Sequence, residues 1–201
     1  MAGKRKAGKA AVKKQEKKSA PKGVAQLRKV MAILGLFSVL AVVFCCLSLG
    51  SLIYIILVSL AVVWLALEVR FDSLGKSLKK ALVLGLFLML FDFAVENVGG
   101  ILGFWQTHGS LFPLWFVPVE IVALTTIGGM AWALYLPRKP DWKYTVFDSW
   151  FFAMFGALGE SLMIRNGLMT YMGGWTPVHA FFGYFVTWLV LHAVWYKVLN
   201  R

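Results

Sequence analysis

Four carboxyl side chains lie within long apolar stretches of the sequence, where a charged group is costly to place. They are Asp92, Glu96, Glu120 and Glu160. An ionised side chain at the centre of a bilayer costs at least about 2.5–3.5 kcal/mol on insertion scales, so such residues mark a site by default. Asp92 and Glu96 are four residues apart and share a helix face. Two carboxyl groups on one face at low dielectric cannot both ionise cheaply, so one is expected to keep its proton. These four acids are the candidate catalytic residues.

A second group of side chains lies near the same acids in the expected helices and could bind a substrate. The group is Trp105, Trp115, Arg165, Tyr171, Trp175 and His179. Arg165 is the only basic residue inside its apolar stretch and is the expected counter-charge for one of the three glutamates. The aromatic residues have two interpretations, which stay open: an interfacial belt of Trp and Tyr, or a cavity wall whose ring faces stabilise a developing cation. His192 is expected to be a packing residue.

The overall composition excludes an ordinary soluble domain. The chain has 201 residues, of which 60% are hydrophobic and only 15% are charged, and its mean hydropathy is +0.74. A soluble domain carries about a quarter charged residues. The sequence therefore predicts an all-α, polytopic membrane protein. It contains no phosphate-binding glycine loop, no Asp-rich diphosphate site and no His/Cys pattern with metal spacing, so no cofactor or metal is expected.

The basic charge of the chain is concentrated at its start. Residues 1–29 contain eleven Lys and Arg and one Glu, which leaves a net charge of only +2 for the remainder. This Lys/Ala/Gly segment lacks apolar periodicity and is expected to be a disordered cytoplasmic tail. It is expected to contact anionic lipid headgroups, with each Lys near the surface adding about 1 kcal/mol. An RNA or an acidic protein is the alternative partner, but nothing in the tail indicates base recognition.

Residues 30–201 are predicted to form a six-helix transmembrane domain. The expected spans are 30–48, 51–69, 81–103, 111–136, 145–171 and 177–199, each close to or above the roughly 20 apolar residues that a bilayer requires. Lys and Arg occur in every second connection and are absent from the three connections between. This positive-inside pattern predicts a multi-pass protein of the cell membrane with both termini in the cytoplasm. A homodimer is compatible with so small a bundle.

The third and fourth expected spans resemble the fifth and sixth. Glu96 and Glu160 are each followed by a glycine seven residues later, and the next spans begin with Pro-Val-Glu and Pro-Val-His. The two pairs enter the membrane from the same side, so the pattern indicates a duplicated helical hairpin, repeated in parallel about an axis along the membrane normal.

The segment Glu96…Gly103-Phe104-Trp105…Pro118-Val119-Glu120 resembles the lycopene cyclase domain of carotenoid pathways and the related carotenoid hydratase-type membrane proteins. That family has an acid, then Gly-x-Trp, then Pro-x-Glu-Glu at the start of the next helix. Ile121 stands in place of the second glutamate. In the second hairpin, Met169 and His179 replace the tryptophan and the first glutamate.

The resemblance implies an enzyme that acts on a carotenoid or other isoprenoid lipid without a cofactor. A neutral carboxyl group would protonate an alkene, and the cation would then lose a proton in a cyclisation or take up water in a hydration. The polyene would enter sideways from the membrane lipids. Two other hypotheses stay open: a non-catalytic scaffold or lipid-binding protein of the same fold, and a small proton-coupled transporter.

Overall fold

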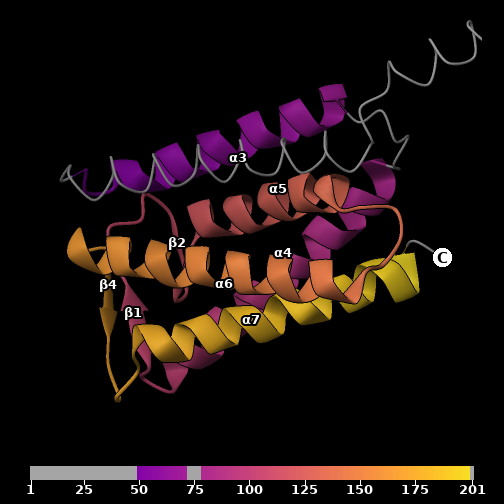
Figure 1. Ribbon diagram of the computed structural model, residues 1–201. Coiled ribbons are helices and arrows are strands. Elements are labelled where there is room, and N and C mark those ends of the chain that lie inside the picture. Colours follow the sequence, from indigo (N-terminus) through magenta and orange to yellow (C-terminus); the bar gives the residue numbers. More distant parts are fainter. Residues whose placement is uncertain (1–48, 72–77, 200–201) are drawn as a thin grey trace, which may run out of the picture. The chain divides into compact units, whose positions relative to one another are not determined.

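The computed structural model describes residues 49–71 and 78–199, which lie in the second of two compact units of the chain. The predicted tail 1–29 and first span 30–48 fall outside the described residues. The described part is mostly helical (Figure 1). Its helices are α3 (Leu52–Phe71), α4 (Leu78–Ile101), α5 (Val119–Tyr135), α6 (Trp142–Arg165), α7 (Pro177–Val194) and the π-helical turn η1 (Trp195–Leu199).

Three of the described helices are long and apolar enough to cross a membrane. They are Leu52–Arg70, Leu78–Ile101 and Pro177–Leu199. These helices support the predicted membrane protein. The segment Val119–Tyr135 is also apolar but has only 17 residues. Helix α6 is 24 residues long and carries Asp148 and Glu160 within its length. The prediction of six spans therefore stays a prediction.

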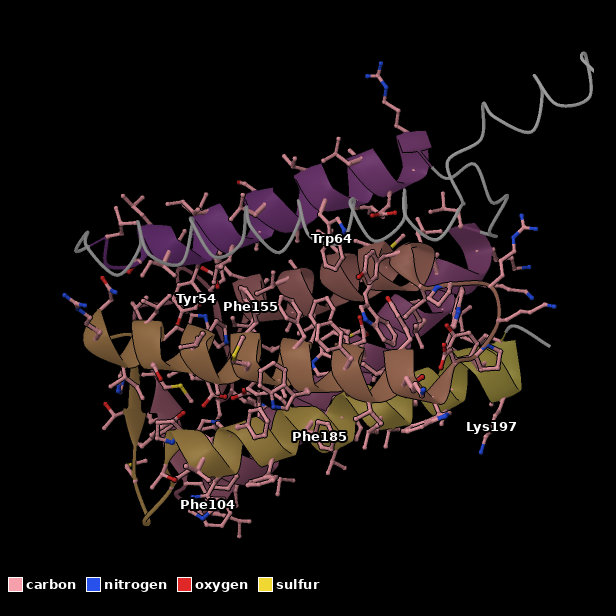
Figure 2. The ribbon with its side chains drawn as sticks, viewed as in Figure 1. Tyr54, Trp64, Phe104, Phe155, Phe185 and Lys197 are labelled. Atoms are coloured by element: carbon pink, nitrogen blue, oxygen red, sulfur yellow. The ribbon has the colours of Figure 1, made fainter. Side chains whose placement is uncertain are left out.

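The two ends of the described helices differ in character. The short strands β1 (Trp105–Thr107) and β4 (Met169–Tyr171) follow α4 and α6 and form an antiparallel pair. We call this end the strand end. The opposite end, the basic end, carries exposed basic side chains that include Arg138, Lys139 and Lys197. Figure 2 shows Tyr54 and Phe104 toward the strand end and Lys197 toward the basic end.

The predicted start of the helix in the fourth span was wrong. Helix α5 begins at Val119, eight residues after the predicted start at Leu111. The intervening residues form the antiparallel strands β2 (Pro113–Leu114) and β3 (Val117–Pro118). Proline lacks the N–H that a helix interior requires. Two prolines within six residues therefore favour a turn that ends immediately before α5.

The third and fifth spans were predicted too long at the strand end, for a shared reason. Gly103 and Gly167 have positive φ values of 70° and 71°. Beyond each glycine, the backbone N–H of the next residue bonds back to a carbonyl five residues earlier, at 2.9 Å for Phe104 and 2.8 Å for Leu168. These are Schellman endings, which need a residue free to adopt the left-handed conformation. Each helix therefore stops, and the chain turns into β1 or β4.

Helices α4 and α5 pack through glycines that let their backbones approach closely. A Cβ atom on Gly85 would lie 2.5 Å from the backbone oxygen of Thr126, and one on Gly129 would lie 3.1 Å from the Cα of Gly85. Membrane helices associate by such packing, since lipid gives them little hydrophobic drive toward each other.

Helices α6 and α7 pack along a stripe of residues spaced four apart on α6. The side chains of Asp148, Phe152 and Glu160 each meet a partner on α7, and Gly156 lies against the ring of Tyr184. Residues at this spacing lie on one helix face. The stripe begins and ends with a carboxyl group and is aromatic between them.

Replacing Gly85 by Ala is expected to destabilise the bundle. The added methyl group would collide with a backbone carbonyl that cannot rotate away, and overpacking of this kind costs about 1–3 kcal/mol. Gly128→Ala is the matched control, because a Cβ there meets nothing within 4 Å among the described residues. Thermal unfolding in detergent should show a lower Tm for Gly85→Ala only. Equal Tm values for the two variants would contradict the close packing of α4 and α5.

Candidate functional site

Glu96 and Glu160 occupy corresponding positions at the strand end and both accept hydrogen bonds from aromatic side chains. The indole Nε1 of Trp105 donates to Glu96 Oε2 at 2.7 Å. The hydroxyl of Tyr184 donates to Glu160 Oε1 at 2.7 Å, and the hydroxyl of Tyr171 donates to Glu160 Oε2. Each glutamate thus receives a donor from the strand that follows its own helix. Glu160 also receives one from α7.

Asp92 completes a cluster of three carboxyl groups. It lies one turn before Glu96 on α4, and the charges of Asp92 and Glu160 both act on Glu96. Asp92 Oδ2 is buried and has no hydrogen-bond partner among the described residues. We call Asp92, Glu96 and Glu160 the carboxyl cluster. Asp92 Oδ2 accepts no hydrogen bond from the described side chains, Glu96 accepts one and Glu160 accepts two.

Aromatic rings lie over the carboxyl cluster at the strand end. Trp105 and Tyr171 are direct partners in the register of β1 and β4. The ring of Trp175 lies 4.8 Å from that of Trp105 and 5.3 Å from that of Phe104, measured between centroids. We call Phe104, Trp105, Tyr171 and Trp175 the aromatic cap. A Cβ on Gly99 would overlap the Trp105 ring, so glycine is required for the indole to reach Glu96.

The hydroxyl group of Tyr171 is held in its protonated, donating form. Burial raises the pKa of Tyr171 well above its usual value, and the hydrogen bond to Glu160 raises it further. A buried phenol loses the solvation that its charged form would need. Tyr171 therefore acts as a fixed donor to Glu160.

Glu120 lies apart from the carboxyl cluster. At the start of α5 it accepts hydrogen bonds from Ser110 Oγ at 2.8 Å and from the backbone N–H of Leu111 at 2.9 Å. Its charge and that of Glu96 both act on Tyr54, so it is a neighbour of the cluster. Of the three glutamates expected to converge, the structure brings two together and adds Asp92. Glu120 instead ties the preceding loop to the first turn of α5.

Arg165 is not the counter-charge that the sequence suggested. It ends α6 as an exposed residue, and among the described residues no ion pair joins it to Glu96, Glu120 or Glu160. The expectation was wrong because the glutamates receive neutral donors in place of a cation.

The other predicted binding residues divide between the aromatic cap and the surface. Trp105, Tyr171 and Trp175 belong to the cap. His179 is exposed, with its ring 5.4 Å from that of Trp175 and its Nδ1 2.8 Å from Thr176 Oγ1. Trp115 is 81% exposed and stacks on Phe93. Trp115 therefore lies on the outside of the bundle.

A second polar cluster, which sequence reasoning missed, lies toward the basic end. Asp148 Oδ2 accepts from Trp132 Nε1 at 2.9 Å and lies 3.0 Å from His192 Nε2. The other ring nitrogen of His192 lies 3.5 Å from Thr145 Oγ1. All of Trp132, Asp148 and His192 are buried. The spacing of Asp148 twelve residues before Glu160, three steps of four on one helix face, is the signal that could have revealed it.

The arrangement at the strand end can move a proton and can stabilise a cation. It offers Asp92, whose buried Oδ2 has no donor among the described residues, two glutamates that accept donors, and aromatic ring faces alongside. Within the described ranges, no group of three or more His, Cys, Asp or Glu is placed to hold a metal ion.

Comparison with known proteins leaves the site to be interpreted from its own geometry. No protein-family model, no curated protein and no solved structure matches this chain.

Proposed function

We propose that the chain is a membrane enzyme that uses the carboxyl cluster for cofactor-independent acid–base chemistry on an apolar alkene, such as a carotenoid or another isoprenoid lipid. The observation that carries the proposal is the meeting of three carboxyl groups from α4 and α6 beneath the aromatic cap, with unequal numbers of hydrogen-bond donors.

The unequal donors suggest a different role for each carboxyl group. A carboxylate in low dielectric is stabilised by each donor that it accepts. Glu160 has two hydroxyl donors and is the best-stabilised carboxylate of the three. Asp92 has an oxygen without a donor among the described residues and is the member expected to keep its proton. In this proposal Asp92 is the acid, Glu160 stabilises the cation, and Tyr171 and Tyr184 are positioning residues.

The proposed reaction begins with proton transfer from Asp92 to one alkene carbon. The π electron pair forms the new C–H bond and leaves a carbocation on the neighbouring carbon. The negative charge of Glu160 and the ring faces of the aromatic cap stabilise that cation. Glu96 then accepts a proton, either from the cyclised cation or from a water molecule that has added to it. Return of this proton to Asp92, one helical turn away, restores the site.

The resemblance to lycopene cyclase-type proteins supports the same proposal, and so does the pairing of the two hairpins. Helix α4, β1 and α5 follow one another in the order of α6, β4 and α7. In each case the glutamate accepts a bond from the strand that follows its helix, Glu96 from Trp105 and Glu160 from Tyr171, although Met169 stands at the position equivalent to Trp105. We therefore include in the proposal a parallel duplicated hairpin within a six-span protein whose strand end faces outward.

A proton-coupled carrier is the second candidate, and the Asp148–His192 pair favours it. Helices α6 and α7 carry ionisable groups toward both ends, as a carrier that takes up a proton on one side and releases it on the other would need. The Phe152–Trp188 stack lies between these groups, with ring centroids 4.7 Å apart. No polar side chain of the α6 stripe lies between Asp148 and Glu160 to pass a proton from one to the other. The enzyme therefore remains our first proposal.

Expression in a lycopene-producing bacterium tests the enzyme directly. We expect a new pigment from the unaltered chain, and at least a hundredfold less of it from Asp92→Asn, because general acid catalysis contributes typically 10²–10⁴-fold. Asp141→Asn is the matched control: Asp141 is an exposed N-cap whose role asparagine can fill. Extracted pigments would be compared at equal membrane protein levels. If expression of the unaltered chain leaves the bacterial pigment as it was, lycopene is excluded as the substrate.

Infrared spectroscopy of the purified protein tests the proton assignment without a substrate. A protonated carboxyl group has a C=O stretching band above the amide I band, and a carboxylate does not. We expect one such band from a buried group at neutral pH, lost in Asp92→Asn and kept in Glu160→Gln and Asp141→Asn. Loss of the band in Glu160→Gln and its persistence in Asp92→Asn would reverse the proposed roles.

A further inference from the structure

The segment Leu111–Val117 presents large apolar side chains to the outside of the bundle. Phe112 is 68% exposed and Trp115 is 81% exposed. Leu111, Leu114 and Phe116 are also exposed. We call this segment the apolar hairpin, because it contains β2 and the first residue of β3. Five exposed apolar side chains in seven residues would be unfavourable in water, at about 25 cal/mol per Å² of apolar surface.

The apolar hairpin turns back along α4 toward the basic end. The ring of Phe116 fills the space beside Gly100, and its backbone N–H donates to Asn97 Oδ1 at 3.4 Å. The ring of Trp115 stacks on Phe93, with centroids 6.2 Å apart. Phe93 lies eight residues before Ile101, the last residue of α4. The tip of the apolar hairpin is therefore roughly 12 Å below the end of the helix, at 1.5 Å per residue.

That depth places the tip within the hydrocarbon layer if α4 crosses the membrane. A helix of 24 residues is about 36 Å long, and the hydrocarbon core is about 30 Å thick. Exposed side chains of α4 between this level and the end of the helix are also apolar, with Val98 54% exposed and Ile101 72% exposed. The surface of the apolar hairpin continues this lipid-facing side of a spanning helix.

Several backbone groups of the apolar hairpin have hydrogen-bond partners within the protein. The Phe116 carbonyl accepts from Thr107 Oγ1 at 2.8 Å, and the Phe112 carbonyl accepts from the Val119 N–H at 3.0 Å. The Leu111 N–H donates to Glu120. Non-helical backbone is tolerated at membrane depth only where the protein satisfies it. Glu120, in the first turn of α5, thus has a structural role as the acceptor for the Leu111 N–H.

Trp115 is held in a conformation that a bulky residue rarely adopts. Its φ is +56°, and it is the only non-glycine residue with positive φ in the part of the chain that the structure describes. Such a conformation costs about 1–3 kcal/mol and persists where the surroundings fix it. Here the Asn97 bond to Phe116 and the stack on Phe93 fix the turn, and they direct the indole outward.

We propose that the apolar hairpin is a re-entrant membrane element whose exposed face binds the acyl chains of lipids in the leaflet at the strand end. The proposal rests on the depth of the hairpin's tip, on its exposed apolar side chains and on its backbone hydrogen bonds. It holds whether or not the carboxyl cluster is catalytic.

Nitroxide accessibility at Trp115 tests the proposal. A nitroxide would be attached to Trp115→Cys in a Cys45→Ser, Cys46→Ser background, with the protein reconstituted in phosphatidylcholine vesicles. We expect collisions with oxygen to exceed collisions with a water-soluble nickel chelate, as for the lipid-facing control Val98→Cys. Gln106→Cys, on exposed β1, should show the opposite order. Nickel accessibility at position 115 equal to that at 106 would overturn the proposal.

A second measurement uses the unaltered protein and does not depend on variants that fold. A phosphatidylcholine with a photoreactive diazirine on its acyl chain would be irradiated in the same vesicles, and labelled peptides would be identified by mass spectrometry. We expect label on both the apolar hairpin and residues 95–101 of α4. Label on α4 without label on the apolar hairpin would overturn the proposal. A disulfide between two copies of the Trp115→Cys variant in these vesicles would also overturn it, because a second copy would then cover the apolar hairpin.

Discussion

A carboxyl group inside an apolar helix bundle needs hydrogen-bond donors that its own helix cannot supply, and this need organises the strand end. The backbone N–H groups of α4 and α6 are engaged within the helices, so Glu96 and Glu160 depend on side chains that arrive from elsewhere. Trp105 and Tyr171 arrive from β1 and β4, and Tyr184 arrives from α7. The glycine endings of both helices, the short strands and the space beside Gly99 all serve to bring these donors to the carboxyl groups.

The same requirement is met toward the basic end by different chemistry. Asp148 receives an indole N–H from α5 and an imidazole nitrogen from α7, so one buried acid links three helices. Removing one partner of such a group leaves an uncompensated buried charge, which is strongly destabilising. The α6 stripe thus joins two polar clusters through an aromatic middle. Asp148 Oδ2 has two partners, whereas Asp92 Oδ2 in the carboxyl cluster has none among the described residues.

Local patterns in the sequence predict part of this arrangement well. Apolar length predicts the helices of a membrane protein, and the four-residue spacing predicts that Asp92 and Glu96 share a face. These predictions succeed because each depends on residues close together in the chain. The Glu-x6-Gly spacing also contains the glycine whose left-handed conformation ends both helices, but it was interpreted only as a sign of duplication.

The predictions that failed depend on contacts between distant residues. The Arg165 counter-charge was wrong because neutral donors from the strands and α7 satisfy the glutamates, and no local pattern shows which donors will arrive. Tyr184 and Asp148 were missed because a lone polar residue in an apolar helix does not reveal its partner. The apolar hairpin was mistaken for helix because its composition is as apolar as that of a span, and only Pro113 within it and Pro118 directly after it indicated the turn.

The pairing of β1 with β4 has a consequence for the order of assembly. Trp105 and Tyr171 are more than sixty residues apart in the chain, yet they are direct neighbours across the strand pair. Strand β4 is synthesised only after α6, so β1 stays without this partner until α5 and α6 have been made. Contacts of such long sequence separation form late, because the loop entropy is lost before they are made. Completion of the aromatic cap therefore requires that α4 and α6, with the strands that follow them, have met.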